Sequence, residues 1–408
     1  MRNYYVDQFS FVAHKFTRSE IRELLKLVGQ PGLISFAGGL PSPETFDKEV
    51  IKELSCYVID NYGDIALQYS QTEGCTELID ALINWAKTED IAITPKNMLI
   101  TTASQQGLYL LGKVFLDPGD KVICSVPTYL GAIQAFRTFR AEFITVPLDP
   151  HTGMETDQVE AILARDRECV KFIYTVPDFQ NPAGVTLSLK KRKHLLELAD
   201  KYQILILEDS PYRWLRYVGE DIPSIQTLDQ GQGRVLTLYT FSKIFVPGFR
   251  LGWAVGPENI IEQMTIAKQG VDLCTPAFNQ LVAAEFINRG LLAKQIANNI
   301  RLYTKKQKIM LEAMDSMMPK VEGLFWTRPE GGLFLWFCMP EGYDTKEMMK
   351  KALEKKVAYV PGSAFDPHGG CGHCARINFS FPPQELIPVG VGRLAEVVKA
   401  EVMATKSR

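Results

Sequence analysis

Residues 235–243 read Val-Leu-Thr-Leu-Tyr-Thr-Phe-Ser-Lys, and residues 247–252 follow as Pro-Gly-Phe-Arg-Leu-Gly. The apolar run predicts a buried strand that ends at Lys243. A lysine at the end of such a strand is costly as a free ammonium. Burial lowers its pKa, however, and makes the amine a nucleophile that can be held as a Schiff base. The stretch therefore predicts a strand that delivers a reactive amine.

A second apolar run, residues 204–207, ends in Glu-Asp-Ser-Pro-Tyr at residues 208–212. An aspartate at this place, Asp209, can form a salt bridge with a pyridinium nitrogen. An amine that forms an imine and such a carboxylate are the two protein groups that pyridoxal 5'-phosphate (PLP) chemistry demands. Lys243 and Asp209 together therefore indicate PLP as the cofactor.

The middle of the chain alternates short apolar runs with amphipathic stretches near a period of 3.6 residues, which predicts an α/β fold around a mostly parallel sheet. After about Leu291 a long helical stretch runs to Met318, and residues 325–337 and 358–360 follow as strand candidates. With 408 residues, two domains are expected. We expect a large α/β domain and a smaller α+β domain, at residues 48–290 and at residues 1–47 with 291–408. The strand candidates of the large domain are residues 98–102, 121–126, 143–147, 170–176, 204–207, 235–241 and 252–255.

Ligands of open parallel sheets bind outside the carboxyl ends of the strands. Polar residues follow five different runs of the expected sheet, so a single sheet would bring them to one crevice. These residues are Ser104, Tyr129, Asn181, Asp209 and Lys243.

A phosphate site is expected where residues 101–107 join a strand to a helical pattern. Ser104 and Gln105 would lie at a helix N-terminus, where free N–H groups and the helix dipole favour a dianion. Arg250 can add a forked, charge-assisted contact, and Ser242 can donate a hydroxyl.

Six motifs in order resemble those of class I PLP-dependent aminotransferases, from about residue 34 to residue 380. The two earliest resemble the subgroup that holds 2-aminoadipate, kynurenine and broad-specificity aromatic aminotransferases. The resemblance implies the PLP-dependent transferase fold of type I. The motifs are Phe-Ala-Gly-Gly-Leu-Pro at 36–41, Leu-Gln-Tyr-Ser at 67–70, Asn-Pro-Ala-Gly at 181–184, Asp-Ser-Pro-Tyr at 209–212, Thr-Phe-Ser-Lys at 240–243 with Pro-Gly at 247–248 and Arg-Leu-Gly at 250–252, and Arg-Ile-Asn-Phe-Ser at 376–380.

The resemblance implies a role for each residue around the cofactor ring. Asp209 would pair with the ring nitrogen, and Asn181 and Tyr212 would hydrogen-bond the phenolic oxygen. Tyr129 would stack on the ring. Lys243, Asp209 and Tyr212 would be the catalytic residues.

The resemblance also implies which residues bind the substrate and which residue contacts the neighbouring subunit. Arg376 would fork onto the substrate α-carboxylate beside Asn181, and Gly39 would let the backbone approach the substrate closely. Arg18 lies in an amphipathic stretch that covers the active site in this subgroup, and it would recognise an acidic side chain. Tyr69 would reach the phosphate of the neighbouring subunit, so a homodimer with shared active sites is implied.

The implied reaction is a ping-pong transamination, in which Lys243 removes the α-proton and returns it as general base and acid. An L-amino acid with an aromatic, aliphatic or 2-aminoadipate-like side chain would donate its amino group to a 2-oxo acid such as 2-oxoglutarate. A PLP-dependent lyase or decarboxylase would share nearly every residue. A transcription regulator on this fold would need a DNA-binding domain before Ile34, where we expect no room. A lysine-assisted serine hydrolase would need Ser-x-x-Lys, but Thr240 stands three residues before Lys243.

Taken alone, each site residue also has an ordinary structural explanation as a cap, a turn, a packed aromatic or a surface ion pair. These explanations apply to Ser104 and Asp209 as caps or turn residues, Asn181 as a turn residue, Tyr69 and Tyr129 as packed aromatics, and Arg18 and Arg376 as surface cations.

The composition is that of an ordinary globular protein, with 46% hydrophobic and 23% charged residues. A net charge of −2 argues against a nucleic-acid partner. No run of about 18 uncharged apolar residues predicts a membrane span, and the first residues lack a secretion signal. We therefore expect a cytoplasmic protein.

Eight cysteines are scattered along the chain, and most sit in apolar surroundings, which predicts reduced core residues. The exception is Cys-Gly-His-Cys at residues 371–374, with His368 just before it. These groups can bind zinc or form a redox pair. Four ligands in so short a span do not easily close a tetrahedron, however. We therefore expect no metal, and a glycine-rich surface loop.

Overall fold

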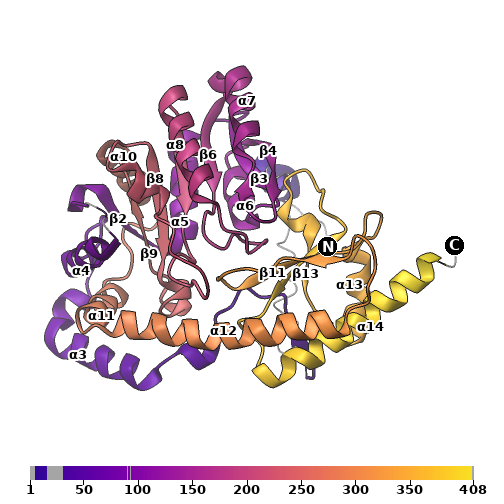
Figure 1. The fold of residues 1–408 in the computed structure, drawn as a ribbon. Coiled ribbons are helices and arrows are strands. Elements are labelled where there is room, and N and C mark those ends of the chain that lie inside the picture. The colour runs from indigo at the N-terminus through magenta and orange to yellow at the C-terminus, as the bar shows by residue number, and fades with distance from the viewer. Residues whose placement is uncertain (1–4, 16–30, 90, 92, 407–408) are drawn as a thin grey trace.

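The structure, a computed structural model, describes residues 5–15, 31–89, 91 and 93–406. Its centre is an eight-stranded sheet in the order β2-β9-β8-β7-β6-β3-β4-β5 (Figure 1). The run from β8 to β4 is parallel, and the pairs β2–β9, β9–β8 and β4–β5 are antiparallel. The expected α/β fold with a mostly parallel sheet is confirmed. The strands are β2 Met98–Thr101, β3 Lys121–Val126, β4 Glu142–Asp149, β5 Gly153–Met154, β6 Val170–Thr175, β7 Leu205–Asp209, β8 Val235–Thr240 and β9 Gly252–Val255.

Successive side chains of the central strands face opposite sides of the sheet, and each side has its own apolar core. On β6, Phe172 and Tyr174 belong to the larger cluster, whereas Ile173 between them belongs to a second one. Helices α7, α8 and α9 contribute to the second cluster, and α5, α6 and α10 contribute to the larger one. These helices are α5 Ala103–Phe115, α6 Leu130–Arg137, α7 Thr156–Asp166, α8 Leu189–Tyr202, α9 Ile225–Asp229 and α10 Glu258–Gln269.

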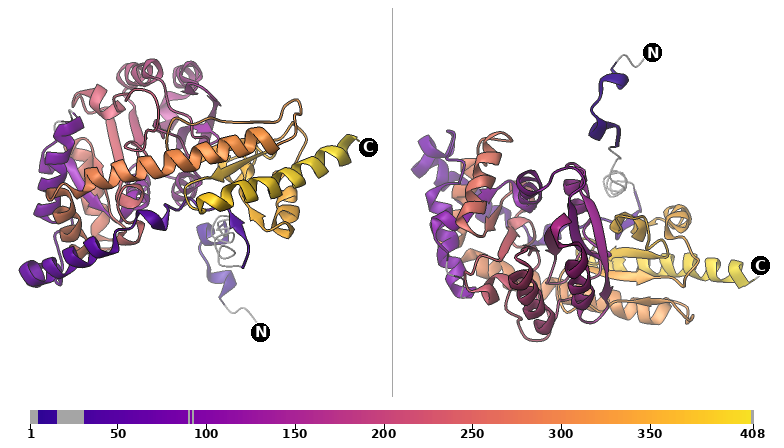
Figure 2. Two further views of the ribbon diagram at one scale, coloured as in Figure 1. Left: turned by 60° about the horizontal axis from the view of Figure 1, so that its bottom comes forward. Right: turned by 90° about the horizontal axis from the view of Figure 1, so that it is seen from above.

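A helix of 27 residues, α12 Leu291–Met317, runs beneath the large sheet toward a second, four-stranded sheet of order β10-β11-β14-β13 (Figure 1). It packs beside α14, as Figure 2 also shows. The pairing of β1 Ile34–Ser35 with β12 brings this early segment of the chain to the second region. Among the described residues, no helix combines the length and the apolar character needed to cross a membrane. The other elements are α1 Phe11–Lys15, α3 Lys48–Ala66, α4 Thr76–Ala86, α11 Ala277–Asn288, β10 Phe325–Trp326, β11 Phe334–Cys338, α13 Thr345–Glu354, β12 Val357–Ala358, β13 Val360–Pro361, β14 Cys374–Asn378 and α14 Ile387–Lys406.

The single strand expected at residues 325–337 is wrong. Two antiparallel strands, β10 and β11, occupy its ends, and the chain between them leaves the sheet. Pro329 cannot donate to a sheet ladder, and Gly332 has φ +72°, so this segment does not continue a strand. The strand candidate at residues 358–360 is likewise divided between β12 and β13, which belong to different sheets.

The expectation of reduced cysteines is wrong for Cys338, which forms a disulfide with Cys374. The two residues are direct partners in the register of β11 and β14. Cys374 therefore lies in a buried strand rather than in a surface loop, whereas Cys371 before it has a free thiol and is half-buried. A ring nitrogen of His373 lies within 4.8 Å of both disulfide sulfur atoms.

Candidate active site

A cavity of about 390 Å³ lies where polar residues follow the carboxyl ends of the parallel strands. Eleven residues singled out from the sequence line it, so the expected convergence on one crevice is confirmed. Tyr69 is not among them, and it is 79% exposed. Arg18 lies outside the described residues. The eleven are Gly39, Ser104, Gln105, Tyr129, Asn181, Asp209, Tyr212, Ser242, Lys243, Arg250 and Arg376.

Lys243 reaches the cavity from a short 3-10 turn, Phe241–Lys243, that directly follows β8. Its Nζ donates a hydrogen bond of 2.8 Å to the carbonyl oxygen of Gly39. Burial and, to a smaller extent, the positive charges of Arg376 and Arg250 together lower the pKa of this amine to about 8. An amine with this pKa is neutral in a useful fraction of molecules near neutral pH, as a nucleophile must be.

Asp209 is the last residue of β7 and is 2% exposed. Its Oδ2 accepts a hydrogen bond of 2.9 Å from the hydroxyl of Tyr174. Its Oδ1 is buried and has no hydrogen-bond partner. Burial raises the pKa of the carboxyl to about 7, while the Tyr174 hydrogen bond acts in the opposite direction. A buried carboxylate oxygen without a donor, in the wall of a cavity, is a place for a ligand's N–H group.

Arg376 projects from β14 and is 1% exposed. Its Nη1 donates to Asn181 Oδ1 at 2.9 Å, its Nη2 donates to the Ala37 carbonyl at 2.7 Å, and its Nε has no partner. Burial lowers the pKa of the guanidinium to about 10. No carboxylate of the described residues forms an ion pair with it. A buried guanidinium without a carboxylate partner favours the binding of an anionic ligand.

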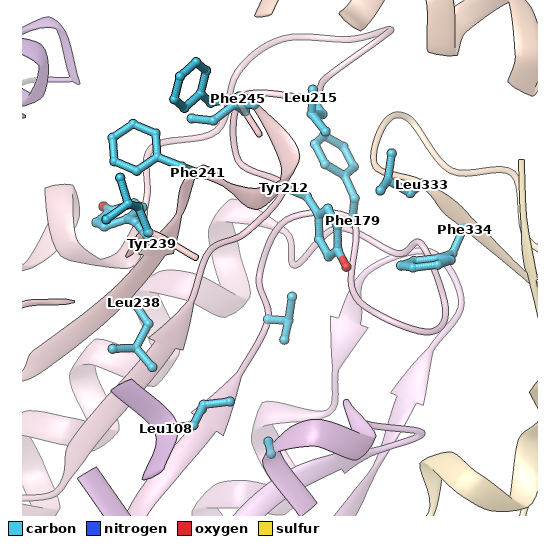
Figure 3. Packing of buried hydrophobic residues seen from close by; sticks show 14 of the residues in the cluster. Leu108, Phe179, Tyr212, Leu215, Leu238, Tyr239, Phe241, Phe245, Leu333 and Phe334 are labelled. Atoms are coloured by element: carbon cyan, nitrogen blue, oxygen red, sulfur yellow. The ribbon is translucent and has the colours of Figure 1, made fainter. Parts of the chain in front are cut away.

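Tyr212 closes the cavity beside this arginine. Its hydroxyl accepts a hydrogen bond of 3.4 Å from Asn181 Nδ2, and burial raises its pKa well above the ordinary value. Its ring meets Phe334 edge to face, with centroids 5.9 Å apart (Figure 3). The hydroxyl is therefore held protonated, as a hydrogen-bond donor.

Ser104, Gln105, Ser242 and Arg250 form a further part of the cavity wall, an anion cradle. Ser104 and Gln105 lie in the first turn of α5, and no side chain caps this helix at Thr102. A Cβ at Gly252 would lie 2.8 Å from the backbone nitrogen of Ser104, so only glycine allows this close packing. Arg250, in the left-handed region at φ 53°, places Nη1 3.5 Å from Ser242 Oγ. Free backbone N–H groups, a hydroxyl and a guanidinium thus gather where the sequence predicts a phosphate.

Tyr129 forms a further wall of the cavity. Its hydroxyl donates to Gln105 Oε1 at 3.3 Å, and Gln105 in turn donates to the Gly131 carbonyl at 3.0 Å. A Cβ at Gly131 would lie 2.5 Å from the tyrosine ring, so the ring packs directly on this glycine.

Three contributors were not identified from the sequence. Tyr174 hydrogen-bonds Asp209, the Phe334 ring lies under the Arg376 guanidinium at 4.2 Å, and Ala37 supplies a carbonyl to that arginine. Tyr174 and Phe334 lie within apolar strands, where an aromatic residue predicts only core packing.

The residues present fit PLP. The orphaned Asp209 oxygen suits the protonated ring nitrogen, the amide and hydroxyl of Asn181 and Tyr212 suit the phenolic oxygen, and the anion cradle suits the phosphate. The Lys243 amine in the same cavity suits the cofactor's aldehyde.

Comparisons with known proteins point in one direction. Residues 45–394 match the family model for class I and II aminotransferases. The chain is 46% identical to aromatic-amino-acid aminotransferase 1 of Thermococcus litoralis, over 98% of this chain and 95% of that protein. The solved structure of a multiple substrate aminotransferase from Thermococcus profundus has a TM-score of 0.93 and 47% identity, covering 98% of this chain and 99% of its own. The alpha-aminoadipate aminotransferase LysN of Thermus thermophilus, solved with N-(5'-phosphopyridoxyl)-L-leucine, has a TM-score of 0.91 and 37% identity, covering 98% and 99%.

Proposed function

The chain belongs to the class I and II aminotransferases and is a PLP-dependent transaminase, and from this premise we propose its substrates and the residues that handle them. Its donors are L-amino acids with aromatic, aliphatic or 2-aminoadipate-like side chains, and its acceptor is a 2-oxo acid such as 2-oxoglutarate. The observation that carries this proposal is Arg376, a buried guanidinium with no carboxylate partner among the described residues, in one cavity with Lys243. The names of similar aminotransferases support the range of side chains.

PLP, when bound, supplies an electron sink for the negative charge left at the substrate α-carbon. Asp209 holds the ring nitrogen, and Asn181 and Tyr212 hold the phenolic oxygen. Tyr129 stacks on the ring. Ser104, Gln105, Ser242 and Arg250 bind the phosphate. The orphaned Asp209 Oδ1 and the uncapped first turn of α5 support these assignments.

Arg376 orients the substrate by its α-carboxylate, and the backbone at Gly39 lies against it, since a Cβ at Gly39 would lie 3.9 Å from Arg376 Nη1. Lys243 Nζ takes the proton from the substrate α-carbon, holds it and returns it. The lowered pKa of this amine supports the double role. In this proposal, residues 48–290 hold the cofactor, while residues 1–47 and 291–408 hold the substrate through Gly39 and Arg376.

The active form is a homodimer in which Tyr69 binds the phosphate of the partner subunit's cofactor. Support comes from exposed apolar side chains on two adjoining segments, Leu67 and Tyr69 after α3 and Val271 and Leu273 after α10. Ser70 Oγ donates to the Thr275 carbonyl at 3.2 Å, so the two segments lie side by side. An apolar patch of this kind on a protein surface marks an interaction site.

A panel of L-amino acids tested against 2-oxoglutarate and pyruvate tests the substrate proposal. We expect turnover with aromatic and 2-aminoadipate donors only when a 2-oxo acid is present. Lys243→Ala is the negative control. Turnover of the amino acid without any 2-oxo acid, or release of carbon dioxide, would instead identify a lyase or decarboxylase.

A further inference from the structure

Tyr174 and Asp209 meet across two neighbouring strands on the larger-cluster side of the sheet. Tyr174 on β6 is the register partner of Leu207 on β7, and Asp209 is two residues further along β7. Side chains two residues apart on a strand share a face, so Asp209 lies on the same face of β7 as Leu207, the register partner of Tyr174. The tyrosine therefore reaches the carboxylate diagonally across the two strands. The result is the 2.9 Å hydrogen bond from its hydroxyl to Asp209 Oδ2.

The tyrosine is fixed in place by its surroundings. It is 1% exposed, and its ring packs edge to face on Phe136 with centroids 5.8 Å apart. Its register partner on β3 is Cys124. Burial and the nearby Asp209 charge raise the pKa of the hydroxyl well above the ordinary value, so the group is a permanent donor. A donor that is always protonated and firmly packed holds the carboxylate oxygen that it binds in one position.

The two oxygens of Asp209 are thereby distinguished. Oδ2 is engaged by Tyr174, and Oδ1 is buried without a partner in the wall of the cavity. We propose that Tyr174 is a positioning residue, whose hydroxyl orients Asp209 with Oδ1 toward the cofactor ring nitrogen and keeps the carboxylate ionised there. This inference rests on the proposed function, because it takes Asp209 as the partner of the ring nitrogen.

The chemical consequence concerns the proton on the ring nitrogen. The hydrogen bond from Tyr174 favours the ionised form of the Asp209 carboxyl, whereas burial favours the neutral form. Without Tyr174, desolvation would act on Asp209 with no opposing donor, and the proton would move from the ring nitrogen toward the carboxylate. Among the described residues, Tyr129 and Cys124 act electrostatically on Tyr174, and Asp209 acts on Tyr212; these three neighbours remain unchanged in the variant.

The first test uses Tyr174→Phe without cofactor, with Asp209 followed by carboxyl ¹³C NMR across pH. We expect the Asp209 pKa to rise in the variant, because the donor that favours the ionised form is gone. Tyr359→Phe is the matched control, since it removes another buried hydroxyl, bonded at 2.7 Å to the Thr345 carbonyl and outside the cavity. An Asp209 titration that is the same in Tyr174→Phe, Tyr359→Phe and the parent protein would overturn the proposal.

The second test uses holoenzyme loaded with PLP that carries ¹⁵N at the ring nitrogen. In Tyr174→Phe we expect the ¹⁵N shift to move from the protonated toward the neutral position, with kcat lower by about 10- to 100-fold, the scale of one hydrogen bond to a charged group. The affinity for 1-deaza-PLP, which lacks the ring nitrogen, should be the same in Tyr174→Phe and in the parent protein, whereas the affinity for PLP should fall. An equal loss of affinity for both cofactors would mean that Tyr174 serves only packing.

Asp209→Ala separates the failure of this inference from the failure of the proposed function. If Asp209→Ala shifts the ¹⁵N signal and Tyr174→Phe does not, the ring-nitrogen assignment holds and the positioning role is wrong. If neither substitution moves the signal, the assignment of Asp209 itself is wrong. Should Tyr174→Phe fold poorly, 3-fluorotyrosine at position 174 keeps the hydroxyl as a stronger donor, and it should lower the Asp209 pKa. An unchanged pKa in that protein would also overturn the proposal.

Discussion

The guanidinium of Arg376 lies over the ring of Phe334, with its Cζ 4.2 Å from the ring centroid. The two residues sit on neighbouring strands, β14 and β11, which are the two inner strands of the smaller sheet, and both side chains line the cavity. The ring restricts the plane of the guanidinium, and bonds to Asn181 and Ala37 fix its rotation. The remaining donors are thus aimed before any substrate arrives, and this preorganisation reduces the entropy lost on binding.

Replacing Arg376 by lysine should lower kcat/KM for amino acids by roughly 100-fold, the scale of breaking one buried, hydrogen-bonded charge pair. A lysine keeps the charge but cannot fork onto a carboxylate or stack on Phe334. The effect should fall mainly on KM, and slow turnover of amines that lack a carboxylate should not change. Arg328→Lys, on an exposed ion pair, is the control. An unaltered KM for amino acids would remove Arg376 from the substrate site.

Replacing Lys243 by alanine should abolish transamination and the covalent attachment of PLP, because the part of the chain that the structure describes places no other lysine in the cavity. Borohydride reduction followed by mass spectrometry measures the attachment. Lys190→Ala, at an exposed position of α8, should behave as the parent protein. Covalent PLP on reduced Lys243→Ala protein would contradict the assignment.

The lowered pKa of Lys243 predicts the pH dependence of cofactor capture. Only the neutral amine attacks an aldehyde, and the amine is neutral above its folded-state pKa of about 8. The rate constant for PLP binding to cofactor-free protein should therefore rise about tenfold per pH unit below that value and level off above it. Stopped-flow absorbance measures this rate. A rise that continues to about pH 10, as for an ordinary lysine, would show that burial does not activate the amine.

Local sequence patterns predicted most of the residues that line this site. The contacts that these patterns did not predict depend on how the strands pair. Lys243, Asp209 and Ser104 each follow a short apolar run, so the position of a strand end was enough to place them at one edge of the sheet. The bond from Tyr174 to Asp209 and the disulfide of Cys338 depend on strand register, which no single segment encodes.

The Cys338–Cys374 disulfide should contribute to stability and not to chemistry. It joins residues separated by 36 positions, and closing a loop of that length in the unfolded chain corresponds to about 3–4 kcal/mol of unfolding free energy. Cys338→Ser, or reduction of the parent protein, should lower the free energy of unfolding by that scale. Activity at moderate temperature should persist, as it should in Cys371→Ser with Cys374→Ser. Denaturant titration of oxidised and reduced protein measures the change in unfolding free energy. Equal unfolding midpoints would contradict a stabilising role of the disulfide.

Tyr69 should complete the active site of the partner subunit. Its ring is 79% exposed and does not line the cavity of its own chain, so a role in catalysis requires a second subunit. A twofold axis makes the exchange reciprocal, and each site then combines Lys243 of one chain with Tyr69 of the other. Lys243→Ala protein, which is inactive alone, and Tyr69→Ala protein, which is weakly active alone, should regain activity when unfolded together and refolded at equal concentrations. Random pairing gives heterodimers in about half of the population, each with one intact site, so about a quarter of the parent activity should return. A mixture of Lys243→Ala with Arg376→Ala is the matched control. Each of these substitutions damages the site of the chain that carries it, so their heterodimer has no intact site. Recovery in this control, or full activity of a monomer at high dilution, would contradict the shared site.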